Sequence, residues 1–451
     1  MKIAQVIHGF PPYSMGGSEL YTYNLSRELA KQDEVFVFYR IADSNRPEYD
    51  MHFTTSNGLN LYAINNTLKS YDSFEKTYKN DSISKIFAYF LEEIKPDIVH
   101  FQHLMCLSTT LIEEAKKRRI PVIFTLHDFW LFCHLGQLLK LDLSICHGPQ
   151  DSECARCQPP RLVTNGTLNK ALNIMRRSGV IFTNKALQRV LLKAFHQHYG
   201  KICYFLQRKR NVQMRKRNIH IKEMCSLVDL FISPSNFLRS KFEDFGIRKN
   251  KIIYYPNGFD LELFSSFSKK KSQKIRFGYI GMFIPSKGIH ILLDAFNNIQ
   301  ARDVELRIHG APQSYHQGFI DYPAYLRSLG KRDNILWFGE YDNNDIARIL
   351  SEIDVLLVPS IWYENAPLTI HEAFMASVPV ITSNIGGMAE FVHDGENGLL
   401  FQVGDSSDLT AKMQMIIDDP DLVNKLQRGI KSVTPIDEHV ENIRKFYRGL
   451  L

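Results

Sequence analysis

The chain has 451 residues, of which 44% are hydrophobic and 23% charged, so it has enough length for about two to four soluble domains. No apolar run reaches the roughly 18 residues of a transmembrane helix. The cysteine count of seven is odd, and the first apolar run stops at Pro11 and Pro12, which argues against a disulfide scaffold and an export signal. We therefore expect a cytoplasmic protein.

The positive charge is concentrated in one segment. The net charge of the chain is +7, whereas residues 161–222 contain fifteen Lys or Arg and no Asp or Glu. The rest of the chain is therefore acidic, and the basic segment needs a local explanation.

Strands and helices are expected to alternate from the first residues onward. Apolar runs predict strands, and Leu20, Tyr23, Leu25 and Leu29 have near-helical spacing between the first two of them. The expected first-half elements are strands at 2–8, 33–40, 97–102 and 120–128 and a helix at 18–32. Because the strands read as continuous apolar runs, they are typical of a parallel sheet covered on both faces.

The second half repeats this plan. It has an apolar strand, a Gly-containing loop and an amphipathic helix in the same order, followed by further strands. The expected elements are strands at 274–281, 304–310, 335–340, 355–360 and 379–384 and helices at 289–300, 367–377 and 438–451. The repetition predicts an α/β fold of two facing Rossmann-like domains, with a hinge near the turn-forming residues 254–260.

Two glutamates, Glu364 and Glu372, flank the expected start of the helix at 367–377. Pro367 suits a first helical turn, and Asn365 just before it is a candidate cap. Even in one helix the glutamates would be about 12 Å apart along the axis, which is poor for an acid–base pair. The spacing favours separate ligand contacts, with a diphosphate at the helix start between them. The alternative is that Glu372 is simply solvated and Glu364 simply belongs to a turn, with no ligand at either.

The block at 359–401 resembles the signature of the family 4 glycosyltransferases, which are retaining enzymes of the GT-B architecture. The resemblance extends to further short motifs and covers nearly the whole chain outside residues 133–222; the motifs lie at 11–19, 97–103, 126–128, 233–235, 256–260 and 286–288. It implies a first domain at 1–255 with an insertion at about 133–222, and a sugar-nucleotide domain at 256–433. A C-terminal helix at 434–451 is expected to pack back on the first domain.

The resemblance also implies roles for single residues. Glu372 would hold the ribose hydroxyls, and Glu364 would approach the transferred sugar. His127 matches a histidine that contacts the donor sugar, and Lys287 would neutralise the diphosphate as it leaves. The backbone that touches the diphosphate or sugar would be that of Asn365, Ala366, Pro367 and Leu368, together with Gly16 and Gly17 from the first domain, where a Cβ atom would be in the way.

One position departs from the family pattern. Relatives carry an arginine in the loop before Lys287, where this chain has Met282. The implied reaction transfers a sugar from a nucleoside diphosphate to a hydroxyl of a glycan or lipid-linked acceptor, with retained configuration. It would use front-face attack, need no divalent metal, and serve surface-polysaccharide or glycolipid synthesis. The alternatives are an epimerase or hydrolase of sugar nucleotides on the same architecture, and a weakly active nucleotide-sugar-binding subunit.

The insertion carries two further hypotheses. Cys133, Cys146, Cys154 and Cys157 could bind a structural Zn²⁺, or could be unligated cysteines in a core. Residues 161–222 combine apolar residues at near-helical spacing with basic ones, which is typical of a helix at an anionic membrane surface but also of a helix packed on its own domain. We expect no nucleic-acid partner, because the chain shows no recognised binding module. The protein would then be cytoplasmic and peripheral to the inner face of the membrane.

Overall fold

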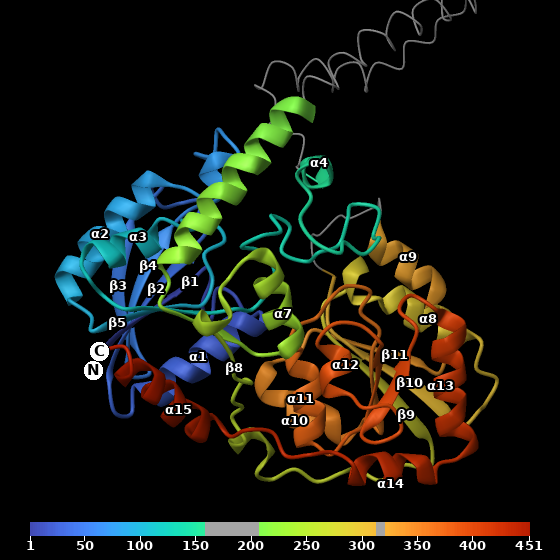
Figure 1. Ribbon diagram of the computed structural model, residues 1–451. Helices are drawn as coiled ribbons and strands as arrows, with labels where there is room; N and C mark the ends of the chain where they lie inside the picture. The colour runs from blue at the N-terminus through green and yellow to red at the C-terminus, as the bar shows by residue number, and fades with distance from the viewer. Residues whose placement is uncertain (158–206, 313–320) are drawn as a thin grey trace, which may run out of the picture.

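The computed structural model describes residues 1–157, 207–312 and 321–451, which form two domains built around separate sheets (Figure 1). Helices cover both sheets, as Figure 1 shows, so the α/β fold class expected from the alternating pattern is confirmed. In these described residues, no helix has the length and apolar character that crossing a membrane requires.

The first domain contains an eight-stranded sheet in the order β3-β4-β2-β1-β5-β6-β7-β8. Its strands are β1 (Lys2–Ile7), β2 (Glu34–Ile41), β3 (Met51–Ser56), β4 (Leu59–Asn65), β5 (Ile98–Phe101), β6 (Val122–Thr125), β7 (Leu230–Ser233) and β8 (Ile252–Tyr254). All neighbours pair in parallel except β3 and β4, which form an antiparallel edge that the sequence did not predict. The central strands are almost fully buried, which explains their continuous apolar sequences.

The helices of this domain begin and end at residues suited to those positions. Asn80 caps α2 by accepting from the backbone N–H groups of Ser82 and Ile83, and Gly246 ends α7 with φ +118°. The helices are α1 (Gly17–Leu29), α2 (Asp81–Ile94), α3 (Leu111–Lys117), α4 (Asp151–Cys154), residues 207–227 and α7 (Asn236–Phe245), with 3₁₀ turns at Glu75–Thr77, Ala155–Cys157 and Lys249–Lys251.

The second domain contains a six-stranded, wholly parallel sheet in the order β11-β10-β9-β12-β13-β14. Its strands are β9 (Ile275–Ile280), β10 (Val304–His309), β11 (Ile335–Gly339), β12 (Val355–Val358), β13 (Val380–Ser383) and β14 (Gly398–Phe401). The helices are α8 (Ile289–Asn297), α9 (Tyr322–Leu329), α10 (Ile346–Ser351), α11 (Leu368–Met375), α12 (Met388–Phe391), α13 (Ser406–Asp418) and α14 (Asp421–Arg428), with 3₁₀ turns at Glu262–Phe264, Pro285–Lys287 and Asn343–Asp345.

The last helix, α15 (Ile436–Arg448), returns to the first domain and lies beside α1 (Figure 1). Its apolar residues Val440, Ile443 and Tyr447 belong to the core formed by α1 and one face of the first sheet. Arg444 anchors the helix through an ion pair with Asp33, 3.0 Å from Nε to Oδ2. The two ends of the chain therefore meet in the first domain.

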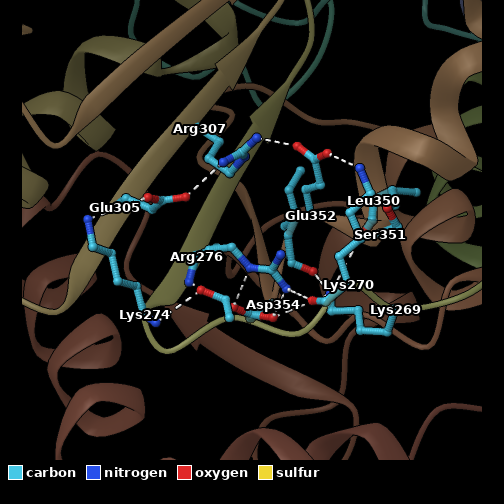
Figure 2. Close-up of polar contacts among 12 residues, drawn as sticks. Lys269, Lys270, Lys274, Arg276, Glu305, Arg307, Leu350, Ser351, Glu352 and Asp354 are labelled. Atoms are coloured by element: carbon cyan, nitrogen blue, oxygen red, sulfur yellow. Dashed lines mark hydrogen bonds and ion pairs between the residues drawn. The ribbon is translucent and has the colours of Figure 1, made fainter.

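Ion pairs fasten the connecting segment between the domains to the second sheet (Figure 2). Arg276, on β9, pairs with Asp354 at 2.8 Å and donates to the backbone carbonyl of Lys270 at 2.7 Å. Lys270 itself pairs with Glu352 at 2.5 Å. These contacts lie at the amino ends of β9 and β12, whereas ligands of such sheets bind at the carboxyl ends of the strands. The ion pairs therefore stabilise the fold away from the ligand edge.

Candidate active site

Loops from both domains meet at the carboxyl ends of the parallel strands. The side-chain amide of Asn365, after β12, donates a hydrogen bond to the backbone carbonyl of His127, after β6, at 2.9 Å. Gly17, at the start of α1, is so close to Leu368 that a Cβ atom on it would lie 3.5 Å from Leu368 Cδ1. Ligands of such sheets bind at this edge, and here the predicted residues of the two domains come together.

The amino end of α11 carries backbone N–H groups without partners. In the described backbone, the N–H groups of Leu368 and Thr369 donate to no carbonyl. The prediction that Asn365 caps this helix is wrong: no side chain caps it, and the Asn365 amide contacts the other domain. Ala366 and Pro367 lead the chain into the helix. Unpaired N–H groups at a helix start attract an anion such as a phosphate.

Glu364 is buried among hydrogen-bond donors. Its Oε1 accepts from Lys287 Nζ at 2.6 Å, from Ser360 Oγ at 2.8 Å and from Trp362 Nε1 at 3.0 Å. Its Oε2 has no hydrogen-bond partner among the described residues. Lys287 is thus held beside the start of α11 by an ion pair that the sequence did not predict, and Glu364 keeps one oxygen available to a ligand.

Glu372, in α11, has a different environment. Its side chain is only 8% exposed, and within the described part of the chain its carboxylate makes no hydrogen bond and no ion pair. Burial raises the pKa of Glu372 to about 7. A buried carboxylate without donors is costly, so a ligand that supplies hydroxyl groups would relieve this cost. The alternative of solvated glutamates is therefore wrong for Glu372.

Glycines allow close approach on both sides of the site. A Cβ atom on Gly16 would lie 2.6 Å from Glu19 Oε2, so this loop packs tightly on its own helix. Gly288 follows Lys287 with φ +70°, and a Cβ atom there would lie 1.8 Å from the carbonyl oxygen of Pro359. Gly288 therefore fixes the turn that points Lys287 at Glu364.

His127 lies two residues beyond β6. Its Nε2 bonds to the side-chain oxygen of Gln102 at 2.9 Å, and its ring meets the ring of Tyr21 edge-on, 5.2 Å between centroids. Burial, followed by the nearby His103, lowers the pKa of His127 to about 3. The imidazole is therefore neutral at physiological pH and donates from Nε2.

A second polar cluster in the first domain was not predicted. Glu19 accepts hydrogen bonds from two neighbouring serine hydroxyls and lies 3.5 Å from His8 Nε2. His8 packs on His103, 4.3 Å between ring centroids, and His103 Nε2 lies 3.1 Å from Asp128. Burial raises the pKa of Glu19, but His8 and the serine hydroxyls lower it more, so the pKa falls below its usual range. The signal in the sequence that could have predicted this cluster is that polar residues follow the ends of β1, β5 and β6.

The four cysteines proposed as zinc ligands are free thiols, and each is half-buried. Burial, and then the neighbouring Cys133, Cys146 and Cys157, raise the pKa of Cys154 to about 12. Among the residues that the structure describes, no three His, Cys, Asp or Glu side chains form a group that could hold a metal ion. Structural zinc therefore stays a prediction, and no step below uses it.

The basic segment is described only in part, since residues 158–206 lie outside the described ranges. Residues 207–227 form a helix that extends away from the first sheet (Figure 1). Val212 and Ile219 are 50% and 54% exposed on it, and Arg208, Arg215 and Lys222 are exposed at helical spacing between and beside them. This face is both basic and apolar, but the apolar residues on which the membrane hypothesis rested lie within 158–206, so that hypothesis stays a prediction.

Comparison with known proteins relates each of the two domains to a protein family. The Glycosyltransferase Family 4 matches residues 15–153, and Glycosyl transferases group 1 matches residues 262–433. An uncharacterized glycosyltransferase of Methanocaldococcus jannaschii is 27% identical over 226 residues, 49% of this chain and 60% of that protein. The capsular polysaccharide biosynthesis glycosyltransferase CapM of Staphylococcus aureus is 26% identical over 65% of this chain and 74% of CapM. The chain spans only 60%, 62% and 33% of the first curated relatives it matches.

Solved structures show the same architecture over the whole chain. Anabaena HepE, in complex with UDP and glucose, has a TM-score of 0.64 at 16% identity and covers 99% of both chains. Sucrose-phosphate synthase of Thermosynechococcus elongatus has a TM-score of 0.65 at 17% identity and covers 100% of this chain and 98% of its own. These likenesses show the GT-B fold, and with the two family matches, one on each domain, they establish that the chain belongs to the family 4 glycosyltransferases.

Proposed function

We propose that this protein is a retaining glycosyltransferase that takes a sugar from a nucleoside diphosphate. The observation that carries the proposal is Glu372, a buried carboxylate that has no partner among the described residues. It lies on the helix whose free amino end faces the Gly16–Gly17 loop. A sugar nucleotide supplies the matching groups, since its ribose has two adjacent hydroxyl donors and its diphosphate is an anion. The UDP and UDP-glucose bound to HepE support this choice of ligand class.

The charges of the site suit departure of a diphosphate. In the proposed complex Glu372 accepts from the ribose, and the N–H groups of Leu368 and Thr369 face the diphosphate. Lys287 exchanges part of its contact with Glu364 for the phosphate oxygens. As the bond to the sugar breaks, negative charge grows on the diphosphate, where the helix start and Lys287 already lie.

The sugar and acceptor ends of the reaction follow from the same geometry. The free oxygen of Glu364 is placed for a sugar hydroxyl, and His127 contacts the sugar from the first domain. A donor phosphate oxygen takes the acceptor proton during front-face attack, so configuration is retained without a glycosidase-type carboxylate pair. The helix start and Lys287 supply the positive charge, so this route needs no divalent metal.

We infer an amphiphilic, anionic acceptor, such as a lipid-linked glycan used in surface-polysaccharide or glycolipid synthesis. A cavity of about 410 Å³ lies between residues 207–227 and α7, and Ile219, Arg215, Lys222 and Lys241 are among its lining residues. Lys241 Nζ also lies 5.7 Å from the ring centroid of Tyr363, the neighbour of Glu364. The lining combines these three basic residues and apolar surface with two carboxylates, Asp151 and Asp244, of which Asp151 pairs with Arg215 at 3.6 Å, so a modest excess of positive charge remains. The exposed basic face of residues 207–227 would let the enzyme meet an anionic membrane.

A sugar-nucleotide epimerase or hydrolase, which would need no acceptor, is the second candidate. A weakly active binding subunit is the third, because the exposed Met282 stands where the family pattern has an arginine. The loss weakens stabilisation of the leaving group and favours a slower enzyme or a binding subunit.

The test is a screen of UDP- and GDP-sugars for thermal stabilisation, followed by product analysis with the stabilising donor. A ligand that binds only the folded state raises its melting temperature. Transfer to an added glycan or lipid-linked acceptor, with retained anomeric configuration, supports the proposal. Donor consumption without transfer supports the epimerase or hydrolase, and stabilisation without turnover supports a binding subunit. If no nucleotide sugar stabilises the protein, the proposal is refuted.

A further inference from the structure

A buried chain of hydrogen bonds leads from His127 through the first sheet to the C-terminal helix. His127 Nε2 donates to Gln102 Oε1 at 2.9 Å, and Gln102 Nε2 donates to Gln5 Oε1 at 3.0 Å. Gln5 Nε2 then donates to the hydroxyl of Tyr447, in α15, at 3.2 Å. Gln5, Gln102 and Tyr447 are completely buried, so water does not compete for these bonds.

The chain continues beyond Tyr447 in the same direction. The Tyr447 hydroxyl accepts from Gln5, so its proton points to His100 Nδ1, 2.7 Å away. His100 Nε2 consequently donates to Thr125 Oγ1, also at 2.7 Å. Burial, and then His127 and His439, lower the pKa of His100 to about 3, which keeps it neutral as this pattern requires. Each group from His127 to His100 therefore donates one bond along the same line.

This direction determines which nitrogen of His127 carries the proton. An amide oxygen only accepts, so the oxygen of Gln102 requires the proton of His127 on Nε2. Nδ1 then holds a lone pair, and it has no hydrogen-bond partner among the described residues. Nδ1 can accept from a ligand hydroxyl.

The orientation of the Gln102 amide is set by Tyr447, at the other end of this chain of hydrogen bonds. If Tyr447 lost its hydroxyl, the inner N–H of Gln5 would have no acceptor, so the Gln5 and Gln102 amides rotated together would make as many hydrogen bonds as in their present orientation. A rotated Gln5 presents its NH₂ to Gln102, which must rotate too, and Gln102 then presents its NH₂ to His127. His127 would have to move its proton to Nδ1, the nitrogen that is otherwise free.

We propose that Tyr447 is a positioning residue, which fixes the Nε2-protonated form of His127 through Gln5 and Gln102. The assignment rests on the proposed function, since it gives His127 a sugar hydroxyl to receive. The proposal also explains why α15 packs against the first domain. When α15 is docked by Val440, Ile443 and Arg444, the Tyr447 hydroxyl is delivered to the centre of the sheet.

The test compares Tyr447→Phe with Tyr62→Phe. Tyr62 is a buried tyrosine of β4 whose hydroxyl donates to Glu93, remote from the hydrogen bonds that lead to His127. Loss of the Tyr62 hydroxyl is therefore a matched control. Nitrogen-15 spectra of labelled histidine distinguish the two protonated forms, and a His127→Asn sample identifies the signal. We expect Nε2-protonated His127 in the wild type and in Tyr62→Phe, and a mixture of both forms in Tyr447→Phe.

Kinetics provide the second readout. Tyr447→Phe is expected to lower kcat by about 5- to 10-fold, the value of roughly one hydrogen bond, with KM for the donor unchanged. Gln102→Met removes the acceptor of His127 directly and should give the same spectrum, so it replaces Tyr447→Phe if that variant does not fold. An unchanged histidine spectrum in folded Tyr447→Phe refutes the proposal, and so does an unchanged spectrum in Gln102→Met where that variant replaces it. If the wild type transfers no sugar, the proposed function fails, while the spectrum still decides whether Tyr447 controls His127.

Discussion

Replacing Glu372 by glutamine should strengthen the free protein and weaken its complex. Burial raises the pKa of Glu372 from 4.5 to about 7. At 1.36 kcal/mol per pKa unit, keeping this carboxylate ionised in the fold costs about 3 kcal/mol. The folded protein binds the proton more tightly than the unfolded chain, so stability falls as pH rises from 4.5 to 7 and stays lower above that window. Glu372→Gln removes the cost and should raise the free energy of unfolding at pH 8, with little change at pH 4.5.

Donor binding should respond in the opposite sense. A ribose hydroxyl donates more strongly to a carboxylate than to an amide by about 1 kcal/mol, so with two hydroxyls the variant should bind the nucleoside diphosphate roughly 30-fold more weakly. Because the ligand favours the ionised form, wild-type affinity should rise with pH up to about 7, with proton release on binding. Glu372→Gln should lose this pH dependence.

Calorimetry at pH 5.5 and pH 8, in two buffers of different ionisation heat, measures affinity and proton release together. Chemical denaturation at the same pH values measures stability. Glu396→Gln is the control, because Glu396 is half exposed and its nearest cation, Lys431, is 3.6 Å away at the surface. Unchanged nucleotide affinity in Glu372→Gln would refute the ribose assignment, and unchanged stability at pH 8 would refute the account of the buried charge.

Further variants test other parts of the structure. Lys287→Met should lower kcat about 100-fold through loss of charge at the leaving group, with melting temperature as the folding control; full activity would contradict this role. Gly288→Ala should destabilise more than Gly395→Ala, since both glycines have positive φ but only Gly288 would clash with backbone; equal melting temperatures would count against the argument. Asp354→Asn should lower the free energy of unfolding by about 2 kcal/mol at pH 7, because it leaves Arg276 unpaired. Burial raises the pKa of Asp354, but Arg276 and Lys269 lower it more, so the pKa lies below 3.8. The difference between variant and wild type should therefore vanish as the pH falls below 3.8. The zinc hypothesis predicts about one Zn²⁺ per chain, lost in a Cys157→Ser variant; metal-free protein of full stability would refute it.

The parts of the fold that sequence reasoning found were those with a local signal. β1, β5, β6, β9, β12 and β13 are mainly apolar runs, β10 alternates apolar and charged residues, and the repeated strand–loop–helix order indicated two parallel sheets. The antiparallel β3 and β4 were missed because β3 is half exposed and polar in sequence. Its identity as a strand depends on pairing with β4, which a single segment does not reveal.

The same division applies to the site. Gly16, Gly17 and Glu372 belong to recognisable motifs, whereas the bond of Asn365 to His127 joins positions far apart in the chain. Gln5, Gln102 and His100 interrupt apolar strands, and such interruptions are a signal that sequence reasoning can use. A polar residue in a buried strand needs a hydrogen-bond partner, but only the structure shows that α15 supplies one.

The difference between Glu364 and Glu372 argues against an acid–base pair more strongly than their spacing does. Donors surround Glu364, including the cation of Lys287, whereas Glu372 has none among the described residues. An acid and a base that exchange one proton must both face the reacting atoms. In the proposed complex the two glutamates instead serve different groups: Glu364 shares Lys287 with the diphosphate, and Glu372 accepts from the ribose.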